Sequence, residues 1–418
     1  SSPPAERLRL PTQPGEDGPS DPLRLRQPLS GDRRSPVRPG EPRPLFGLSA
    51  AGGDDADPRT FPRERQHSSG GRCADGGAVR TARSDRGNRR IPFDAPVAPH
   101  GYRWFYADGV SDDGARGVVL IAMIGNVFSP YFAAARRDAE SRGETVRPED
   151  FVTLNAILYD RKQGRFCLTE GGASLLDRSA TTLRIGASRV VRDGDGLLFW
   201  IDEKSAVLGE PLRGVVRFTF PEPTADVYPL DPAGRHRWTP YAPVARCEAF
   251  FEEPRLDFRG SGYVDGNDGD EPLERGFTSW DWCRAEDDSG NRVVIYDTFP
   301  RDSAAARAEG GEETARTNAA PQTIARSGRD DLPADCTLPP RRLLPSTLFQ
   351  MDRAIRCDVG REPRVLETME DAPFYARSLV ETTLFGRRMQ AVHETVNLDR
   401  FSARWCQFLI GFRMRRHR

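Results

Sequence analysis

The sequence predicts a mostly β protein, built from antiparallel barrels or sandwiches. From residue 91 onward, short apolar runs recur every dozen residues or so, and Gly, Asp and Pro separate them. Only one stretch has the composition of a helix. Many short strands with little helix are typical of closed or stacked antiparallel sheets.

The beginning of the chain differs from the rest. Residues 1–90 are rich in Pro, Gly, Ser, Arg and Asp and show almost no aliphatic periodicity. Such a segment buries too little apolar surface to offset the entropy lost on ordering, so we expect a disordered tail. Its surplus of Arg leaves two interpretations open: an unstructured leader without a function, or a tail that touches an anionic membrane surface.

The expected strands begin with residues 117–125, a continuous apolar run suited to a buried strand. The first half continues with runs at 151–159, 166–169, 188–192, 197–201 and 215–220. The second half repeats the pattern at 246–252, 256–259, 278–284, 292–297, 364–368, 378–385 and 389–395. One short helix is predicted at residues 130–141, with Ser129 as the N-cap before Pro130.

These patterns divide the chain into a tail at 1–90, a first β domain at 91–245 and a second β domain at 246–418. Residues 301–335 are polar, small and poor in β-branched side chains, so we expect a solvated insertion or a disordered loop. Residues 405–418 combine an apolar segment with a basic cluster. They predict either a closing strand with a solvated basic end or an anchor at an anionic membrane surface, where each Arg contributes ~1 kcal/mol.

Composition argues against several classes of protein. The formal net charge of −1 and the pI near 6.6 argue against a dedicated nucleic-acid binder. The cysteines are scattered without a CxxC pair, which predicts neither a zinc knuckle nor a disulfide framework and favours reduced thiols in the cytoplasm. No apolar run of about 18 residues predicts a spanning helix, and residues 1–30 lack the apolar core of a signal peptide.

Signatures of common catalytic sites are largely missing as well. The sequence contains no GxSxG, Walker loop, HExxH or helix-opening GxGxxG. Its histidines are not paired at ligand spacing, so neither a metal nor another cofactor is predicted.

A polar and aromatic group of residues in the middle of the chain carries candidate chemistry. If residues 234–240 are extended, His236 and Trp238 share one face while Arg235 and Arg237 share the other. This arrangement suits a strand that lines a cavity. The alternative is a half-buried strand with a hydrogen-bonded core histidine.

Residues 260–271 repeat this period of two. Tyr263 and Asp265 lie on one face of an extended strand, and the continuation, rich in Gly, Asn and Asp, predicts a turn. The spacing does not fit a calcium loop, because the position that needs Gly holds Asp270 and the last ligand position holds Gly276. An acidic surface turn remains the alternative.

Two tryptophans follow at the same spacing. Trp280 and Trp282 share a face of the strand predicted at 278–284. Two inward-facing indoles beside an acid suit a site that stabilises a carbocation, because aromatic faces attract positive charge. Packing in the core is the alternative.

Seven strings along the chain form a series: GYRWFYAD (101–108), GNVFSPYFAAAR (125–136), LNAILY (154–159), DPAGRHRWTPYAP (231–243), GSGYVDGNDGDEPLERGFTSWDW (260–282), EDAPFYARS (370–378) and HETVNLDRF (393–401). In this order they resemble the acyclic carotenoid 1,2-hydratases, also called hydroxyneurosporene synthases, of photosynthetic bacteria. The similarity covers roughly residues 92–416, and the collinear order makes it specific. Two features depart from the family pattern: residues 301–335 lack an apolar strand, and the long Arg/Pro tail is not a family feature.

The resemblance implies two lipocalin-like barrels in tandem, within a wider group that includes pericyclase-type Diels–Alderases. It implies an acyclic carotenoid substrate such as neurosporene or lycopene, a 1-hydroxy-1,2-dihydro product and no cofactor. It also implies a cytoplasmic enzyme bound peripherally to the photosynthetic inner membrane. Two other functions of this fold stay open, a non-catalytic carrier of carotenoid or lipid and a cyclase or pericyclase.

Hydration of an isolated alkene needs a strong proton donor and protection for the tertiary cation at C1. An unperturbed Asp is ionised at pH 7, but burial in an apolar barrel raises a carboxyl pKa by up to ~3–5 units. Following the family resemblance, we predict Asp265 as the general acid, with Tyr263 sharing its proton network. Trp238 would face the cation, and His236 would orient or deprotonate the attacking water.

The remaining candidates support this arrangement. Trp280 and Trp282 would line the aromatic wall of the substrate site. Asp268 or Asp270 would replace Asp265 if the strand register differed by one pleat.

Overall fold

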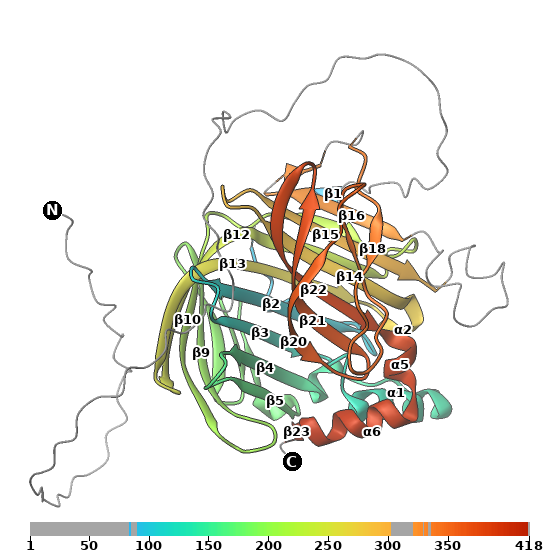
Figure 1. The fold of residues 1–418 in the computed structure, drawn as a ribbon. Coiled ribbons are helices and arrows are strands. Elements are labelled where there is room, and N and C mark those ends of the chain that lie inside the picture. Colours follow the sequence, from blue (N-terminus) through green and yellow to red (C-terminus); the bar gives the residue numbers. More distant parts are fainter. Residues whose placement is uncertain (1–82, 85–89, 302–320, 329, 333–335, 417–418) are drawn as a thin grey trace, which may run out of the picture. The chain divides into compact units, whose positions relative to one another are not determined.

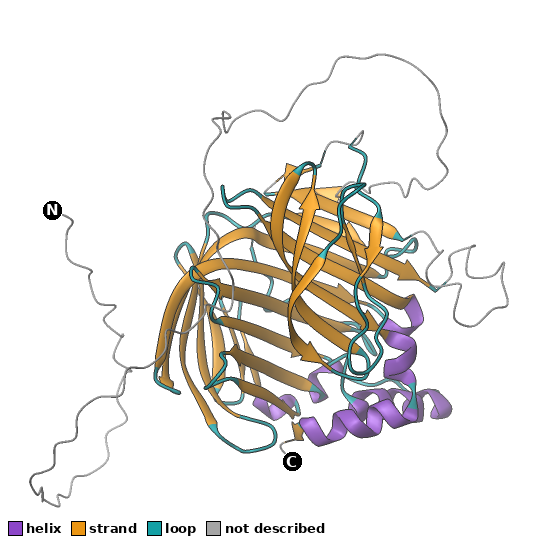
Figure 2. Cartoon of the chain, viewed as in Figure 1, coloured by secondary structure: helices purple, strands orange, loops and turns teal. Residues whose placement is uncertain are grey.

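A computed structural model describes residues 83–84, 90–301, 321–328, 330–332 and 336–416 of the chain. Within this part, antiparallel strands dominate the regular structure, as Figure 2 shows. The prediction of a mostly antiparallel β fold is confirmed. The predicted tail at 1–90 and much of the stretch 301–335 lie outside the described residues.

The larger sheet collects the strands up to residue 269 and one short strand from the end of the chain. They are β1 (Arg83–Ser84), β2 (Tyr102–Ser111), β3 (Gly117–Ile124), β4 (Val152–Tyr159), β5 (Arg165–Gly171), β6 (Leu176–Arg178), β7 (Thr182–Ile185), β8 (Ser188–Asp193), β9 (Gly196–Lys204), β10 (Pro211–Thr219), β11 (Asp226–Pro229), β12 (His236–Glu253), β13 (Leu256–Gly269) and β23 (Arg415–Arg416). Their order is β23-β5-β4-β3-β2-β13-β12-β10-β9-β8-β7-β6, with β11 on β12 and β1 on β11 (Figure 1). Of these pairs, β23 runs parallel to β5.

The second sheet follows in sequence. Its strands are β14 (Phe277–Glu286), β15 (Arg292–Pro300), β16 (Gln322–Ser327), β17 (Asp330–Asp331), β20 (Arg364–Asp371), β21 (Tyr375–Leu384) and β22 (Arg387–Asn397), in the order β17-β16-β15-β14-β22-β21-β20. A separate pair joins β18 (Arg341–Leu343) and β19 (Ala354–Arg356). Every strand predicted from the sequence overlaps one in these sheets.

The helices are short. They are α1 (Pro130–Arg142), α2 (Leu273–Gly276), α5 (Leu398–Ser402) and α6 (Arg404–Arg413), with 3-10 turns at Pro148–Asp150 and Ala173–Leu175. The predicted helix start is confirmed, since the Ser129 hydroxyl accepts a hydrogen bond from the Phe132 amide at 3.1 Å and Pro130 opens α1. Gly143 ends the helix in the left-handed conformation, which glycine adopts without steric cost.

Strands β2, β3 and β4 of the larger sheet are buried on both faces. Along β2, Phe105 and Ala107 point into an aliphatic core, whereas Trp104 and Tyr106 point to the opposite side. On that side the second sheet contributes its own rings, and the centroid of Tyr106 lies 5.9 Å from that of Trp282. The two sheets therefore meet in a layer rich in aromatic side chains.

The Gly- and Asp-rich end of β13 corrects one expectation. The sequence predicts a turn here, but the strand continues to Gly269. A Cβ at Gly266 would stand 2.8 Å from the Tyr241 ring, and one at Gly269 would stand 2.4 Å from the Tyr102 ring. These glycines serve close packing against rings rather than a change of chain direction, so the turn prediction is wrong.

Two further expectations about elements are wrong. Strand β16 lies inside the stretch 301–335, where no strand was expected, because its buried Thr323 and Arg326 find partners on neighbouring strands and hide the apolar pattern. One of the two interpretations of residues 405–418 was a closing strand, but the apolar part forms α6 and only Arg415–Arg416 pair with the larger sheet, as β23. The buried Cys406 and Ile410 of α6 are four residues apart, the spacing of one helix face.

The predicted boundary between residues 245 and 246 falls within β12, which runs unbroken from His236 to Glu253. The division into two domains stays a prediction. Among the described residues, no helix is both long and apolar enough to cross a membrane.

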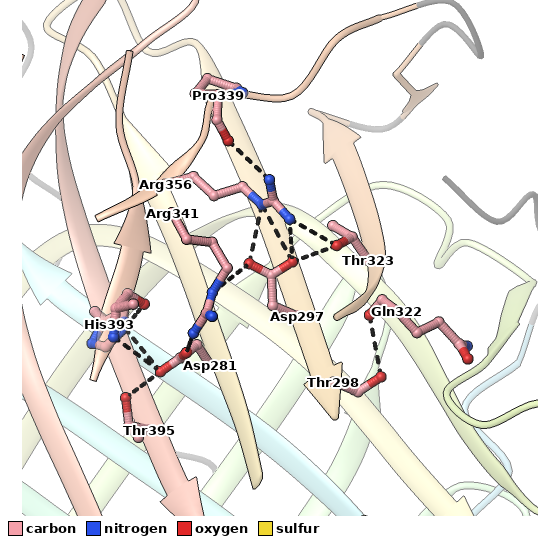
Figure 3. Close-up of polar contacts among 11 residues, drawn as sticks. Asp281, Asp297, Thr298, Gln322, Thr323, Pro339, Arg341, Arg356, His393 and Thr395 are labelled. Carbon is pink, nitrogen blue, oxygen red and sulfur yellow. Dashed lines mark hydrogen bonds and ion pairs between the residues drawn. The ribbon is translucent and has the colours of Figure 1, made fainter. Parts of the chain in front are cut away.

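A buried polar network fastens the connection between β16 and β20 to the second sheet (Figure 3). Arg356 donates to Asp297 at 2.8 and 3.0 Å, and the Thr323 hydroxyl donates to the same carboxylate at 2.5 Å. Arg341 pairs with Asp281 on the neighbouring strand. Asp297 and Asp281 each have an arginine partner in this network, so we assign it a structural role.

Asp297→Asn is expected to lower the free energy of unfolding by about 3 to 5 kcal/mol, because buried Arg356 would keep its charge without a carboxylate. Urea denaturation followed by circular dichroism measures this loss. As a control, Asp202→Asn breaks an exposed pair with Arg213 and is expected to cost less than about 1 kcal/mol. Equal losses in the two variants would contradict the assignment.

Candidate active site

A cavity of about 350 Å³ is lined by residues of both sheets. Its walls are mostly aromatic and aliphatic, and they include Trp104, Tyr106, Ile121, Ile157, Trp280, Trp282, Tyr296 and Phe374. Residues 370–375 and the last turns of α6 line the cavity as well. A long apolar molecule suits such a lining better than a polar one.

Asp265 reaches this cavity from β13 and is 6% exposed. Its Oδ2 accepts hydrogen bonds from the Trp238 indole Nε1–H and from the Tyr263 hydroxyl, each at 2.7 Å. Both donors come from the same sheet, one from β12 and one from β13 itself. The structure therefore brings together three of the predicted site residues around one carboxyl group.

Burial raises the pKa of Asp265 to about 7. The hydrogen bonds from Trp238 and Tyr263 oppose this shift, whereas the nearby carboxylates of Glu394 and Asp108 add to it. A carboxyl group with this pKa is partly protonated at neutral pH and can donate its proton, which an ordinary Asp cannot do. Tyr263 keeps its own proton, since burial also raises its pKa.

His236 lies elsewhere. It is fully buried and does not line the cavity; its Nδ1 is 2.9 Å from the Tyr102 hydroxyl and its Nε2 is 3.4 Å from Glu271. Burial lowers its pKa to about 4, so the ring is neutral at pH 7. Its ring also packs against Phe277 at 4.8 Å, which places His236 in a supporting layer behind the cavity wall.

The three predicted tryptophans have two different roles. Trp280 and Trp282 line the cavity, as predicted from their shared face. Trp238 is fully buried outside the lining and touches the site through its indole N–H to Asp265. Its ring packs on Tyr228 and Tyr296 instead.

Asp268 and Asp270 are not in the cavity. Arg237 binds both, with Arg237 Nη2 at 2.6 Å from Asp268 and 2.8 Å from Asp270. Along β13 the acids at 265 and 268 fall on opposite faces, because they are an odd number of residues apart. The strand register therefore selects Asp265 as the cavity acid.

Sequence reasoning missed a group of charged residues at the same cavity. Glu394 on β22 lines it, and Arg377 on β21 is its direct cross-strand partner and pairs with it. Arg377 also binds the Asp108 carboxylate at 3.1 Å and the Tyr106 hydroxyl at 2.8 Å. These contacts tie the second sheet to the larger one.

Asp108 completes this group. Arg284 lies 2.6 Å from its Oδ1, and the Tyr106 hydroxyl lies 2.7 Å from its Oδ2. Although burial alone would raise the pKa of Asp108, Arg284 and Arg377 hold it below its ordinary value. Two carboxylates and two guanidinium groups thus form a buried, nearly neutral cluster between the sheets.

The environment of Glu394 differs from that of Asp265. Burial raises its pKa, but the guanidinium of Arg377 opposes the shift, and such a cation favours the ionised form. Asp265, in contrast, has no cation among its direct partners. One cavity therefore holds an acid whose pKa is raised by desolvation and a second carboxyl group that is paired with Arg377.

One signal in the sequence points to the missed group. Tyr106 and Asp108 are two residues apart in a run that is otherwise mostly apolar and aromatic. A charge in such a strand needs a partner from another strand. Among the described residues, no cluster of three or more His, Cys, Asp or Glu side chains is arranged to hold a metal ion.

Comparison with known proteins identifies the family. The family model described as Carotenoid hydratase CrtC matches residues 120–418. The acyclic carotenoid 1,2-hydratase of Thiocapsa roseopersicina is 39% identical over 394 residues, which cover 94% of this chain and 92% of that protein. The protein of the same name from Rubrivivax gelatinosus is 38% identical over 325 residues, covering 78% and 75%.

Among solved structures, kievitone hydratase from Nectria haematococca aligns with a TM-score of 0.43 at 8% identity, over 77% of this chain and 98% of that one. The resemblance inferred from the seven strings is confirmed by the family model and the two relatives: this chain belongs to the carotenoid hydratase family.

Proposed function

We propose that this protein adds water across the terminal C1–C2 double bond of an acyclic carotenoid such as neurosporene or lycopene. The observation that carries the proposal is a buried Asp265, with a pKa raised to about 7, at the wall of an apolar and aromatic cavity. The names of the two relatives support the substrate class.

The reaction begins with proton transfer from Asp265 to C2. The C2–H bond forms as the π electrons leave C1, which becomes a tertiary cation, and Asp265 becomes a carboxylate. Trp238 and Tyr263 donate to Oδ2 and stabilise the negative charge as it develops. They also fix the carboxyl group so that its other oxygen is available to the substrate.

The cation is stabilised by the surrounding cavity wall. The ring faces of Trp282 and Tyr106 attract positive charge, and the carboxylate of Glu394 adds a Coulombic contribution. Water then adds to C1, and Glu394 accepts a proton from the resulting oxonium ion. This assignment gives Glu394 the role that the sequence suggested for His236. Between turnovers, water carries this proton from Glu394 back to Asp265, which restores both groups.

His236 acts as a positioning residue in this proposal. It holds Tyr102 at the end of β2 and packs against Phe277 at the start of β14. The same contacts keep β12 in register with its neighbours on the cavity side.

Mass spectrometry distinguishes this function from the alternatives. Purified protein is incubated with lycopene under argon, and the product is expected to gain the mass of one water. A carrier would return unchanged lycopene, and a cyclase or pericyclase would give a product of unchanged mass. Either result would refute the proposal.

The pH dependence follows from the pKa of Asp265. The acid acts in its protonated form, so kcat/KM is expected to fall about tenfold per pH unit above about pH 7. A steady-state profile from pH 5 to pH 9 measures this limb. A rate that rises through pH 7 would show that the carboxylate, not the acid, is the active form.

The membrane and cytoplasmic assignments are further parts of the proposal. We propose a cytoplasmic protein bound peripherally to the photosynthetic membrane, without a nucleic-acid partner and without a cofactor. A substrate confined to lipid supports the membrane assignment, and the near-neutral net charge of −1 supports the exclusion of nucleic acid.

A further inference from the structure

The outward face of α6 has an unusual composition. Trp405, Phe408 and Phe412 are 51%, 67% and 67% exposed. At a spacing of three and then four residues they lie along one side of the helix, and the Phe408 and Phe412 ring centroids are 5.0 Å apart. A surface helix normally presents polar residues to solvent, whereas the exposed side of α6 presents aromatic residues.

The buried side of α6 already has its partners. Ile410 and Cys406 pack into the core, and the Gln407 side chain accepts a hydrogen bond from Arg137 of α1 at 3.3 Å. In Figure 1, α6 lies beside α1 and α5, and contacts with both helices fix its orientation. Helix α6 thus packs against the protein with its buried face, and the aromatic side chains lie on its opposite, exposed face.

This aromatic face is continuous with the cavity. Leu409, Ile410 and Arg413 of α6 line the cavity, and Leu409 is itself 41% exposed. Phe349 also lines the cavity and is 37% exposed, and its neighbour Leu348 is 88% exposed.

The loop that carries these two residues is fastened to the helical side. Arg400 of α5 donates to the backbone carbonyls of Phe349 and Gln350, at 2.5 and 2.7 Å. Leu348, Phe349 and the outward face of α6 therefore form an apolar rim at the cavity mouth. We call this set, with Trp405, Phe408, Leu409 and Phe412, the mouth rim.

The size of the cavity shows why such a rim is needed. An apolar cavity of ~150 Å³ holds one benzene, or roughly 25 Å³ per carbon. At about 350 Å³, the cavity would therefore hold on the order of fourteen of the roughly forty carbons of an acyclic carotenoid. Most of the chain has to remain outside, and exposing it to water would be strongly unfavourable.

We infer that the mouth rim inserts into the surface of an anionic lipid bilayer, so that the substrate enters end-first while the rest of its chain stays among the acyl chains. The inference rests on the proposed carotenoid substrate for its argument from volume. The charges agree with it: α6 contains no acidic residue, Arg404 at its start is exposed, and the Arg413 side chain at its end is 43% exposed, although it lies 3.8 Å from Glu370. Aromatic side chains flanked by Arg are typical of helices that lie in the membrane interface.

The test compares two variants by flotation with vesicles of phosphatidylcholine and phosphatidylglycerol. The triple variant W405Q/F408Q/F412Q removes exposed aromatic side chains, and Gln is a good helix former. The matched control V207Q/L208Q removes two side chains that are each 77% exposed, in the turn between β9 and β10, and that line no part of the cavity. The wild type and the control are expected to float with the vesicles, and the triple variant is expected to bind at least tenfold less.

A second measurement separates this inference from the proposed reaction. The triple variant is expected to hydrate lycopene in detergent micelles at the wild-type rate, but vesicle-embedded lycopene at least tenfold more slowly. Equal flotation of the triple variant and the wild type would overturn the inference. So would a wild type that does not float and forms a dimer that the triple substitution dissociates, because a second copy would then cover the rim. A wild type that floats but does not hydrate lycopene in micelles would refute the reaction and leave the docking surface intact.

Discussion

Asp265→Asn is expected to lower the rate of hydration by roughly a thousandfold or more, because asparagine has no proton to give to C2. The amide oxygen can still accept the hydrogen bonds of Trp238 and Tyr263, so the shape of the cavity is expected to persist. Carotenoid binding, followed by the change in the absorption spectrum of the substrate, is expected to remain. Asp268→Asn is the matched control on the same strand, since Asp268 pairs with Arg237 outside the cavity. Substantial activity in Asp265→Asn would contradict the proposed acid.

The same variant has a readout that does not depend on activity. The unfolded chain ionises Asp265 above its ordinary pKa of 3.8, whereas the folded protein keeps the proton up to about pH 7. Ionisation therefore favours unfolding increasingly between about pH 4 and pH 7, and the effect then becomes constant. Relative to Asp265→Asn, the wild type is expected to lose on the order of 4 kcal/mol of stability across this window. Urea denaturation at pH 4 and pH 8 measures the change.

Glu394→Gln is expected to reduce kcat by about a hundredfold to a thousandfold with a smaller change in KM. Glutamine cannot accept the proton of the attacking water, and it removes negative charge near the cation. Glu381→Gln on the adjacent strand is the control, since it changes only an exposed cluster with Arg364 and Arg388. Equal activities of Glu394→Gln and the wild type would exclude Glu394 as the base.

A shifted pH profile distinguishes this role from a purely structural one. The carboxylate of Glu394 contributes to the raised pKa of Asp265, so its neutralisation is expected to lower that pKa. The alkaline limb of kcat/KM should then begin at a lower pH in Glu394→Gln than in the wild type. A variant that is merely less stable would lose amplitude without moving the limb.

The fold could be predicted from local patterns wherever a strand is apolar and bounded by turn residues. The run at β3 and the capped start of α1 are examples. Prediction failed at positions where tertiary contacts, rather than local structure, determine which residue type is needed. Gly266 and Gly269 look like turn residues until the rings of Tyr241 and Tyr102 are placed against them. Likewise, α6 resembles a strand by apolar content alone, because its exposed side is apolar as well.

Only part of the candidate site could be predicted from the sequence. Asp265, Tyr263, Trp238, Trp280 and Trp282 have a period of two within short segments, so a strand model brings them to one side. Glu394 could not be found in this way, because its place at the site depends on contacts with Arg377 on the next strand and Tyr106 on the other sheet. For His236 the strand pattern predicted too much. A face shared with Trp238 does not determine whether either side chain reaches the cavity.

The arginines between the sheets have a consequence for the chemistry. In the proposed reaction the proton donor lies on one sheet and the proton acceptor on the other. The distance between them therefore depends on how the two sheets are held together. Arg377 and Arg284, both from the second sheet, grip Asp108 of the first. We infer that these two ion pairs set the distance between Asp265 on one sheet and Glu394 on the other, on which both proposed proton transfers depend.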